Sequence, residues 1–177
     1  MQWFQFTKEG VFGFNASHPP EYVKWVEIAH DQTYGDRLRQ VAKSASGDCF
    51  MVVEHDIAVS WELIQELSDL HVDPSIILAV NYNLYPVSTY LTHPVIAHRD
   101  IPDGELRFIG SLPPGSLGSI LAFGLGCTRL PRDFVLDHVD PAWDYPLLDT
   151  QMSYRAASLG VGMVAYAPRS PIVHLHY

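Results

Sequence analysis

The sequence is poor in cysteine, in basic residues and in long apolar runs, and each shortage excludes a class of protein. Two cysteines among 177 residues cannot build a disulfide framework or a structural zinc site. Only 11 lysines and arginines stand against 20 acidic residues, and the resulting formal charge of −9 disfavours extended binding to nucleic acid. The longest apolar stretches fall far short of the roughly 20 residues that a membrane-spanning helix needs, so we expect no membrane span.

What the sequence does contain is typical of one globular domain. Hydrophobic residues make up 47% and charged residues 18%, and no repeat, low-complexity tract or Ser/Gly-rich linker divides the chain. We therefore expect a single compact domain over residues 1–177. The opening segment, MQWFQFTKEG, lacks the basic start and apolar run of a signal peptide, and a cytoplasmic location is the expectation.

Apolar strands alternate with segments of helical periodicity along the chain. The clearest strand is the continuous apolar run Cys49–Val53, which follows Gly47. Apolar spacing and capping residues predict helices over 20–29, 34–44, 60–70 and 146–160. Other apolar segments predict strands at 3–6, 11–14, 76–80, 162–167 and 172–176. This alternation predicts an α/β/α sandwich with a mixed, mostly parallel sheet.

Two carboxylates and a histidine follow the clearest strand directly, as Glu54-His55-Asp56. Ligands of open α/β sheets bind at the carboxyl ends of the strands. Alternate residues of an extended segment point to one side, so Asp56 can bind a divalent cation while Glu54 holds a ribose or sugar hydroxyl. The alternative is an acidic turn that merely ends the strand in solvent.

Histidine is the residue that stands out, with nine in the chain, and His174 and His176 share the one-residue spacing of the acidic turn. On a strand both lie on one face, so either imidazole can complete a metal site begun by Asp56. Mixed carboxylate and imidazole ligands suit Mn²⁺ or Mg²⁺ beside phosphates, and zinc is chemically possible. The alternative is a tract of surface histidines. Cys127 fits a small buried residue better than a nucleophile, because no sequence neighbour lowers its pKa.

Three sequence blocks, taken in order, resemble GT-A-type glycosyltransferases: CFMVVEHDI, GLGCTRLPRDFV and WDYPLLDTQMSYRAASLGVGMVAYAPRSPIVHLH. The resemblance covers about Asp31 to Tyr177 and is greatest to small glycosyltransferases encoded by bacteriophages of actinobacteria. It implies a single GT-A-like, Rossmann-like domain. It also implies a sugar donor in the form of a nucleotide-diphosphate sugar, most commonly a UDP-sugar, a hydroxyl acceptor, and dependence on Mn²⁺ or Mg²⁺.

The resemblance also implies roles for individual acids and histidines. Asp56 matches the cation ligand of the family's acidic motif, usually Asp-x-Asp, and Glu54 matches the position near the donor's ribose or sugar. Asp149 matches the acid that opens a helix beside the acceptor and is the general base in inverting members. A helix N-cap is the alternative role for this aspartate. One of His174 and His176 matches the histidine that completes the metal site.

Further positions match the surroundings of the donor and acceptor. Gly126 belongs to the segment 124–128 that matches the loop near the donor sugar, and Trp143 matches the acceptor side. Arg37, like Arg39 and Arg129, is a candidate diphosphate contact, with a surface salt bridge as the alternative for each. The opening segment departs from the usual nucleotide-gripping start of the family.

Two other functions fit the same residues. A metal-dependent nucleotide-sugar hydrolase or phosphoesterase would use the same ligands with water as the nucleophile. A degenerate domain would bind a glycan or a partner protein without catalysis. The residues do not identify the acceptor. The resemblance to phage glycosyltransferases implies a DNA base, a virion protein or a glycan. The aromatic residues Trp3, Phe4 and Phe6 suit the surface of a homo-oligomer as well as a core.

Overall fold

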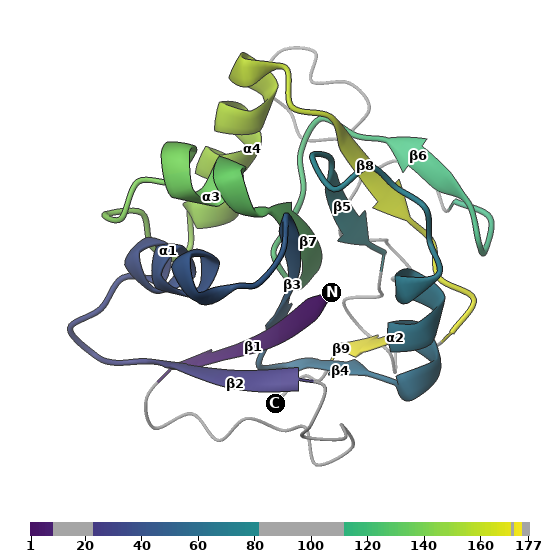
Figure 1. The fold of residues 1–177 in the computed structure, drawn as a ribbon, viewed down its shortest axis with the longest axis horizontal. Coiled ribbons are helices and arrows are strands. Elements are labelled where there is room, and N and C mark those ends of the chain that lie inside the picture. The colour runs from purple at the N-terminus through teal and green to yellow at the C-terminus, as the bar shows by residue number, and fades with distance from the viewer. Residues whose placement is uncertain (9–22, 82–111, 171, 175–177) are drawn as a thin grey trace.

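The computed structural model describes residues 1–8, 23–81, 112–170 and 172–174 (Figure 1). Within them, one mixed sheet of 7 strands has the order β2-β1-β3-β7-β5-β8-β6, and β4 pairs with β9 in a small second sheet. The strands are β1 (Gln2–Lys8), β2 (Val23–Ile28), β3 (Cys49–Glu54), β4 (Ile57–Val59), β5 (Ile77–Val80), β6 (Leu117–Ser119), β7 (Cys127–Pro131), β8 (Met163–Tyr166) and β9 (Ile172–His174). The helices are α1 (Tyr34–Ser44), α2 (Trp61–Ser68), α3 (Arg132–His138) and α4 (Leu148–Leu159).

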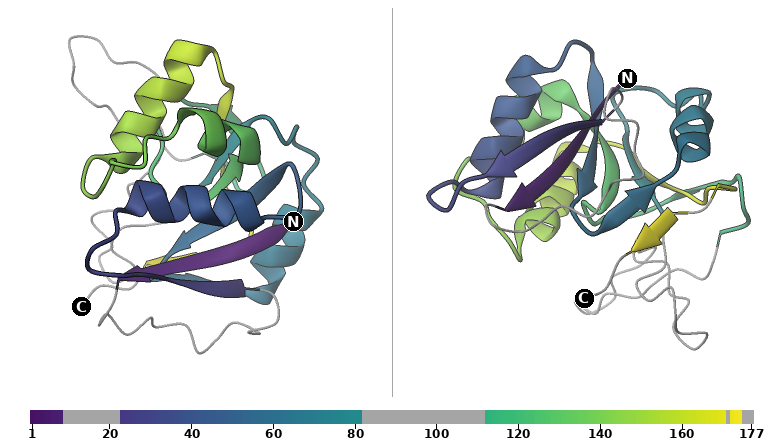
Figure 2. Two further views of the ribbon diagram at one scale, coloured as in Figure 1. Left: turned by 60° about the vertical axis from the view of Figure 1, so that its left-hand side comes forward. Right: turned by 90° about the horizontal axis from the view of Figure 1, so that it is seen from below.

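Most strands of the large sheet share one direction. β2, β1, β3, β5 and β8 run the same way, while β7 and β6 run against them. Helices α1, α3 and α4 cover one face of the sheet, and α2 lies on the other (Figures 1 and 2). The prediction of a Rossmann-like α/β/α sandwich with a mixed, mostly parallel sheet is therefore confirmed.

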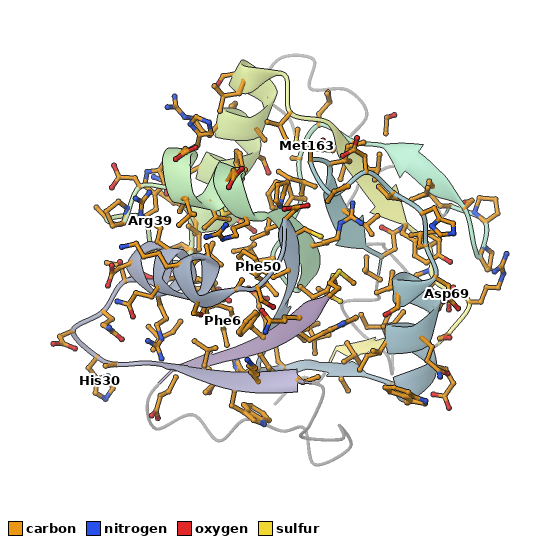
Figure 3. The ribbon with its side chains drawn as sticks, in the orientation of Figure 1. Phe6, His30, Arg39, Phe50, Asp69 and Met163 are labelled. Carbon is orange, nitrogen blue, oxygen red and sulfur yellow. The ribbon has the colours of Figure 1, made fainter. Side chains whose placement is uncertain are left out.

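Aromatic residues of the first strand pack beneath α1. The rings of Phe6 and Tyr34 stack with centroids 5.0 Å apart, and Phe4 meets Phe50 edge to face at 5.8 Å. Figure 3 shows Phe6 and Phe50 between the sheet and α1. The exposed fractions of Trp3, Phe4 and Phe6 are 2%, 4% and 1%, so these side chains belong to the core and not to an exposed oligomer surface.

The helix predicted over 20–29 is wrong, because residues 23–28 form the edge strand β2. Its Val23 and Val26 are three residues apart, which fits a helix, but Ile28 continues the buried face at the two-residue spacing of a strand. These β-branched residues favour extended backbone, and β2 pairs in parallel with β1 over its whole length. The pairing partner therefore decided the structure of this segment.

Local capping residues fixed the helices that were predicted correctly. Thr33 caps α1 by accepting from the N–H of Asp36, and Ser60 caps α2 in the same manner. Helix α4 ends at Gly160, whose φ of 69° is the left-handed conformation that glycine adopts at little cost. The predicted strand at 11–14 lies outside the described residues. Among the described helices, none has both the length and the apolar character needed to cross a membrane.

Candidate functional site

The acidic turn lies at the carboxyl edge of the large sheet, where β3 ends. After Asp56 the chain leaves this sheet, because β4 pairs with β9 and not with β3. The N–H of Glu54 donates to the carbonyl oxygen of Gly126 at 2.9 Å, so the segment just before β7 is held against the turn. The structure thus brings together two positions, Glu54 and Gly126, that the sequence placed near the donor.

Three carboxyl groups share one electrostatic environment at this edge. Burial, together with the negative charges of Asp56 and Asp149, raises the pKa of Glu54 to about 8. Burial also raises the pKa of Asp149. Asp149 lies on α4, far along the chain from β3. Because its charge raises the pKa of Glu54, the fold brings Asp149 close to the acidic turn.

Asp149 lies in the first turn of α4, but it is not the N-cap. The N-cap is Leu147, which makes no capping hydrogen bond, and Oδ1 of Asp149 accepts from the N–H of Thr150 at 2.7 Å. The capping role considered for this aspartate is therefore wrong. One turn later, the hydroxyl of Ser153 accepts from the N–H of Phe123 at 3.0 Å, which ties α4 to the segment that leads to Gly126.

The chain between α3 and α4 is bound to the start of α1. The N–H of Gly35 donates to the carbonyl of Trp143 at 2.9 Å, and the N–H of Tyr34 donates to Asp144 Oδ1 at 3.1 Å. A Cβ at Gly35 would lie 2.5 Å from the carbonyl oxygen of Asp140, so only glycine permits this approach.

Tyr34 connects this loop to the acidic turn. Burial raises the pKa of its phenol, and the charges of Glu54 and Asp56 act in the same direction. Its hydroxyl oxygen is buried and has no hydrogen-bond partner among the described residues. The Trp143 loop, Tyr34 and the acidic turn are therefore adjacent parts of one site.

Trp143 also lines an open groove of about 480 Å³ on the helical side of the molecule, together with Arg39, His138, Asp137 and Arg155. Figure 3 shows Arg39 on α1 close to this helical surface. The groove combines one aromatic ring with both hydrogen-bond donors and acceptors, the set that a hydroxyl-rich molecule requires.

The candidate arginines have different surroundings. Arg37 donates to Oε1 of Gln40 at 2.8 Å within α1, and Arg39 donates to the carbonyl of Val139 at 2.8 Å. Arg129 is 4% exposed and donates to the carbonyls of Val72, Asp73 and Ile76, at 3.0, 2.6 and 3.2 Å. Since these carbonyls precede β5, Arg129 supports the opposite end of the sheet and is not a diphosphate contact.

Of the two predicted metal histidines, His174 is the last residue of β9. The backbone of His174 is in register with Ile57, the residue that follows Asp56, so this strand lies beside the acidic turn. The side chain of His174 and all of His176 lie outside the described residues. Within the part of the chain that the structure describes, no three His, Cys, Asp or Glu side chains are arranged to hold a metal ion. The carboxylate oxygens of the acidic turn are nonetheless the donors that Mg²⁺ and Mn²⁺ prefer.

Sequence reasoning missed Gln5, which lies under the acidic turn. Its side chain is completely buried in β1, and Nε2 donates to the carbonyls of Glu54 and Ile57 at 3.0 and 3.2 Å. A glutamine between Phe4 and Phe6 in an apolar strand was the available clue, because a buried amide needs partners. Cys127 is buried, and its pKa is raised by that burial, as expected of a residue without a nucleophilic role.

Comparisons with known proteins show similarity of fold. No protein-family model and no curated protein matches the sequence. The structure of A197 from STIV has a TM-score of 0.53 at 13% identity, over 100% of this chain and 95% of that one. UTP-bound UGPase from Acinetobacter baumannii has a TM-score of 0.52 at 13% identity, over 87% of this chain and 56% of that one. UDP-glucose pyrophosphorylase from the same organism has a TM-score of 0.50 at 13% identity, over 88% and 56%.

The chain therefore spans about half the length of the two bacterial enzymes. At such low identity, the likeness establishes a common α/β fold and no more. The class that fold and site define is a Rossmann-like α/β protein with an acidic cluster at the carboxyl edge of its sheet.

Proposed function

We propose that this chain binds a nucleotide-diphosphate sugar at the carboxyl edge of its sheet and transfers the sugar to a hydroxyl acceptor. The observation that carries the proposal is the common electrostatic environment of Glu54, Asp56 and Asp149. A reaction of a hydroxyl group with a diphosphate sugar needs one carboxylate that can accept a proton and another that can bind a cation. The sequence resemblance to GT-A-type glycosyltransferases supports the same assignment.

The similar solved structures support a nucleotide ligand. Two of them are UDP-glucose pyrophosphorylase structures, one of which is bound to UTP. Ligands of such sheets bind outside the carboxyl ends of the strands, which is where the acidic turn and Gly126 meet. We therefore assign the donor to this edge, with UDP-sugars as the first class to test.

A divalent cation fits the donor set of the turn. Asp56 would hold Mn²⁺ or Mg²⁺ together with His174 or His176, and the backbone of His174 pairs with Ile57, the residue after Asp56. When bound, the cation would neutralise charge on the diphosphate leaving group. Glu54 lies beside this position, where it can hold a hydroxyl of the ribose or the sugar.

Asp149 is assigned as the general base. The oxygen of the acceptor hydroxyl forms a bond with the anomeric carbon, and the bond from that carbon to the diphosphate oxygen breaks. The electron pair leaves with the diphosphate, and the hydroxyl proton passes to Asp149. Burial raises the pKa of this carboxyl, which makes its ionised form a stronger base.

The groove beside Trp143 suits the acceptor side of such a reaction. Trp143 offers an aromatic face for stacking, and Arg39, Arg155 and Asp137 offer donors and acceptors for hydroxyl groups. The loop that carries Trp143 leads directly into α4 and Asp149. An acceptor that is rich in hydroxyls, such as a glycan, is therefore the class we favour.

Nucleotidyl transfer is the second candidate, because the pyrophosphorylase structures have this fold. Its nucleophile is the phosphate of a sugar phosphate, which is already anionic and needs no general base. The charges of Asp56 and Asp149 would repel that nucleophile. The acidic cluster therefore favours a neutral hydroxyl as the nucleophile over a phosphate.

Product analysis tests these assignments. The purified chain is incubated with UDP-sugars, Mn²⁺ and a panel of glycan acceptors, and the products are identified by mass spectrometry. We expect a glycosylated acceptor and free UDP, and we expect neither product when the UDP-sugar or the acceptor is left out. Release of free sugar without an acceptor would identify a hydrolase. Formation of a UDP-sugar and pyrophosphate from UTP and a sugar phosphate would identify a nucleotidyltransferase and overturn the proposal.

A further inference from the structure

Gln5 joins the two ends of the acidic turn through a single amide group. Its Nε2 donates to the carbonyl oxygen of Glu54 at 3.0 Å and to that of Ile57 at 3.2 Å. These two residues flank His55 and Asp56, so one buried side chain holds the backbone on both sides of the candidate cation ligand. Gln5 is 0% exposed, and the strand that carries it lies beside β3 in the sheet.

The turn that Gln5 holds is also the point where the chain changes sheets. β3 belongs to the large sheet, whereas β4 begins at Ile57 and pairs with β9. Because His174 is in register with Ile57, the direction in which β4 leaves the turn decides where β9 lies relative to Asp56. An amide that binds the last carbonyl of β3 and the first carbonyl of β4 fixes that direction.

A packing role alone does not account for a glutamine at this position. Gln5 is completely buried, and an apolar side chain of similar size would pack there without desolvating an amide. The Oε1 of Gln5 is buried and has no hydrogen-bond partner among the described residues, so the side chain is not fully satisfied. The amide therefore carries a cost in stability that its two bonds to the turn must offset.

We propose that Gln5 is a positioning residue that fixes the acidic turn and β4, and through them sets the affinity of the site for its cation. The cation part of this inference rests on the proposed function. The positioning part rests on the hydrogen bonds of Gln5 alone. The two parts need separate measurements so that each can fail by itself.

The test compares Gln5→Met with the matched control Gln2→Met. Methionine keeps the size of glutamine and removes its donors. Gln2 lies on the same strand and also bonds to backbone, accepting from the N–H of Ser46 at 2.8 Å, but at the end of β1 away from the turn. Gln5→Asn, which keeps the amide and shortens the side chain by one methylene, is the second variant if Gln5→Met does not fold.

Hydrogen–deuterium exchange tests the positioning part without any ligand. In Gln5→Met we expect faster exchange in residues 54–59, while the rest of β3, residues 49–53, and β1 keep their protection. In Gln2→Met we expect residues 54–59 to exchange at the wild-type rate. Unchanged exchange of this segment in a folded Gln5 variant would overturn the positioning role, whatever the protein binds.

Mn²⁺ titration of the full chain, followed by electron paramagnetic resonance, tests the cation part. We expect Gln5→Met to weaken Mn²⁺ binding by about tenfold or more, and Gln2→Met to leave it unchanged. Equal affinities of wild type and Gln5→Met would overturn the link to the cation. If wild type binds no Mn²⁺, the metal-dependent function fails, and a change in exchange alone would then still establish the positioning role.

Discussion

The ring of Tyr34 stacks on Phe6 at a centroid distance of 5.0 Å and an interplanar angle of 17°, which fixes the first residue of α1 in the core. The same residue donates its backbone N–H to Asp144, and its phenol lies within the field of Glu54 and Asp56. Tyr34 therefore links the first strand, the loop before α4 and the acidic turn. Three segments that are far apart in the sequence meet around this one side chain.

Tyr34→Phe is expected to leave stability unchanged or to raise it slightly. The buried hydroxyl has no partner among the described residues, and an unsatisfied hydroxyl costs about 1–3 kcal/mol. The stacked ring is retained, so packing against Phe6 is not disturbed. Urea unfolding of the ligand-free protein checks this, with Tyr34→Leu as the control that removes the ring and should destabilise. A clear loss of stability in Tyr34→Phe would mean that the hydroxyl is bonded in the folded protein.

Asp149→Asn is expected to lower the turnover number by about 10²–10⁴-fold while leaving donor binding nearly unchanged. Asparagine keeps the shape of the side chain but cannot accept the acceptor's proton. Because burial raises the pKa of Asp149, the wild-type rate should rise with pH through a range above that of an ordinary aspartate, and the variant should lose this rise. Asp69→Asn, at the exposed end of α2, is the control. Full activity of Asp149→Asn would remove this residue from the mechanism.

Glu54 makes the metal-free protein less stable as the pH rises. Its pKa is about 8 in the folded chain, against about 4.3 when unfolded, so between these values the folded state binds the extra proton. Stability must then fall with rising pH across this window. Glu54→Gln removes the effect and should exceed wild type in stability by roughly 4–5 kcal/mol at pH 8, and by about 1 kcal/mol at pH 5.

Urea unfolding in the presence of a chelator, at both pH values, measures this difference. Glu62→Gln, an exposed change in the first turn of α2, serves as the control. A variant that is less stable than wild type at pH 8 would mean that Glu54 is ionised and favourably paired in the folded protein.

Glu66 has the opposite pH dependence, because hydrogen bonds stabilise its charged form. Its carboxylate accepts from the hydroxyl of Tyr166 at 2.6 Å and from the N–H groups of Arg169 and Ser170 at 2.8 and 2.9 Å. These bonds lower the pKa of Glu66 to about 2. The stability it contributes is complete above the unfolded pKa of about 4.3 and is lost as the pH falls towards 2.

Glu66→Gln should therefore cost roughly 1 kcal/mol at pH 7 and progressively less below pH 4, since the side chain is only half-buried. It should also loosen the segment that leads from β8 to β9. Thermal unfolding as a function of pH checks the first effect. A constant difference between pH 7 and pH 2.5 would contradict the role of the charge.

The parts of the fold that could be predicted from sequence are those decided by neighbouring residues. Thr33 and Ser60 start α1 and α2, and Gly160 ends α4, because each acts within one turn of itself. The run Cys49–Val53 is apolar on both faces, which identified a buried strand. The segment Val23–Ile28 was misassigned because its pairing with β1 is not visible in its own periodicity.

The acidic residues of the site could be predicted from sequence, but the residues that hold them in place could not. Glu54 and Asp56 follow a recognisable strand, and Asp149 precedes a recognisable helix. Their convergence depends on the sheet order, which local patterns do not encode. Gln5 was missed for the same reason, since its role exists only because β1 lies beside β3. Arg129 was wrongly predicted as a candidate diphosphate contact, because the sequence around an arginine does not show which buried carbonyls it will bind.

The measurement that tests the central claim most directly is calorimetric titration of nucleotide diphosphates and nucleotide sugars into the full chain. It is made with Mn²⁺ and with chelator, on wild type and on Asp56→Ala, with Asp69→Asn as the folded control. We predict that wild type and the control bind at least one uridine nucleotide only when Mn²⁺ is present, and that Asp56→Ala does not. Binding of no nucleotide by folded wild type, or equal binding by Asp56→Ala, would contradict the account.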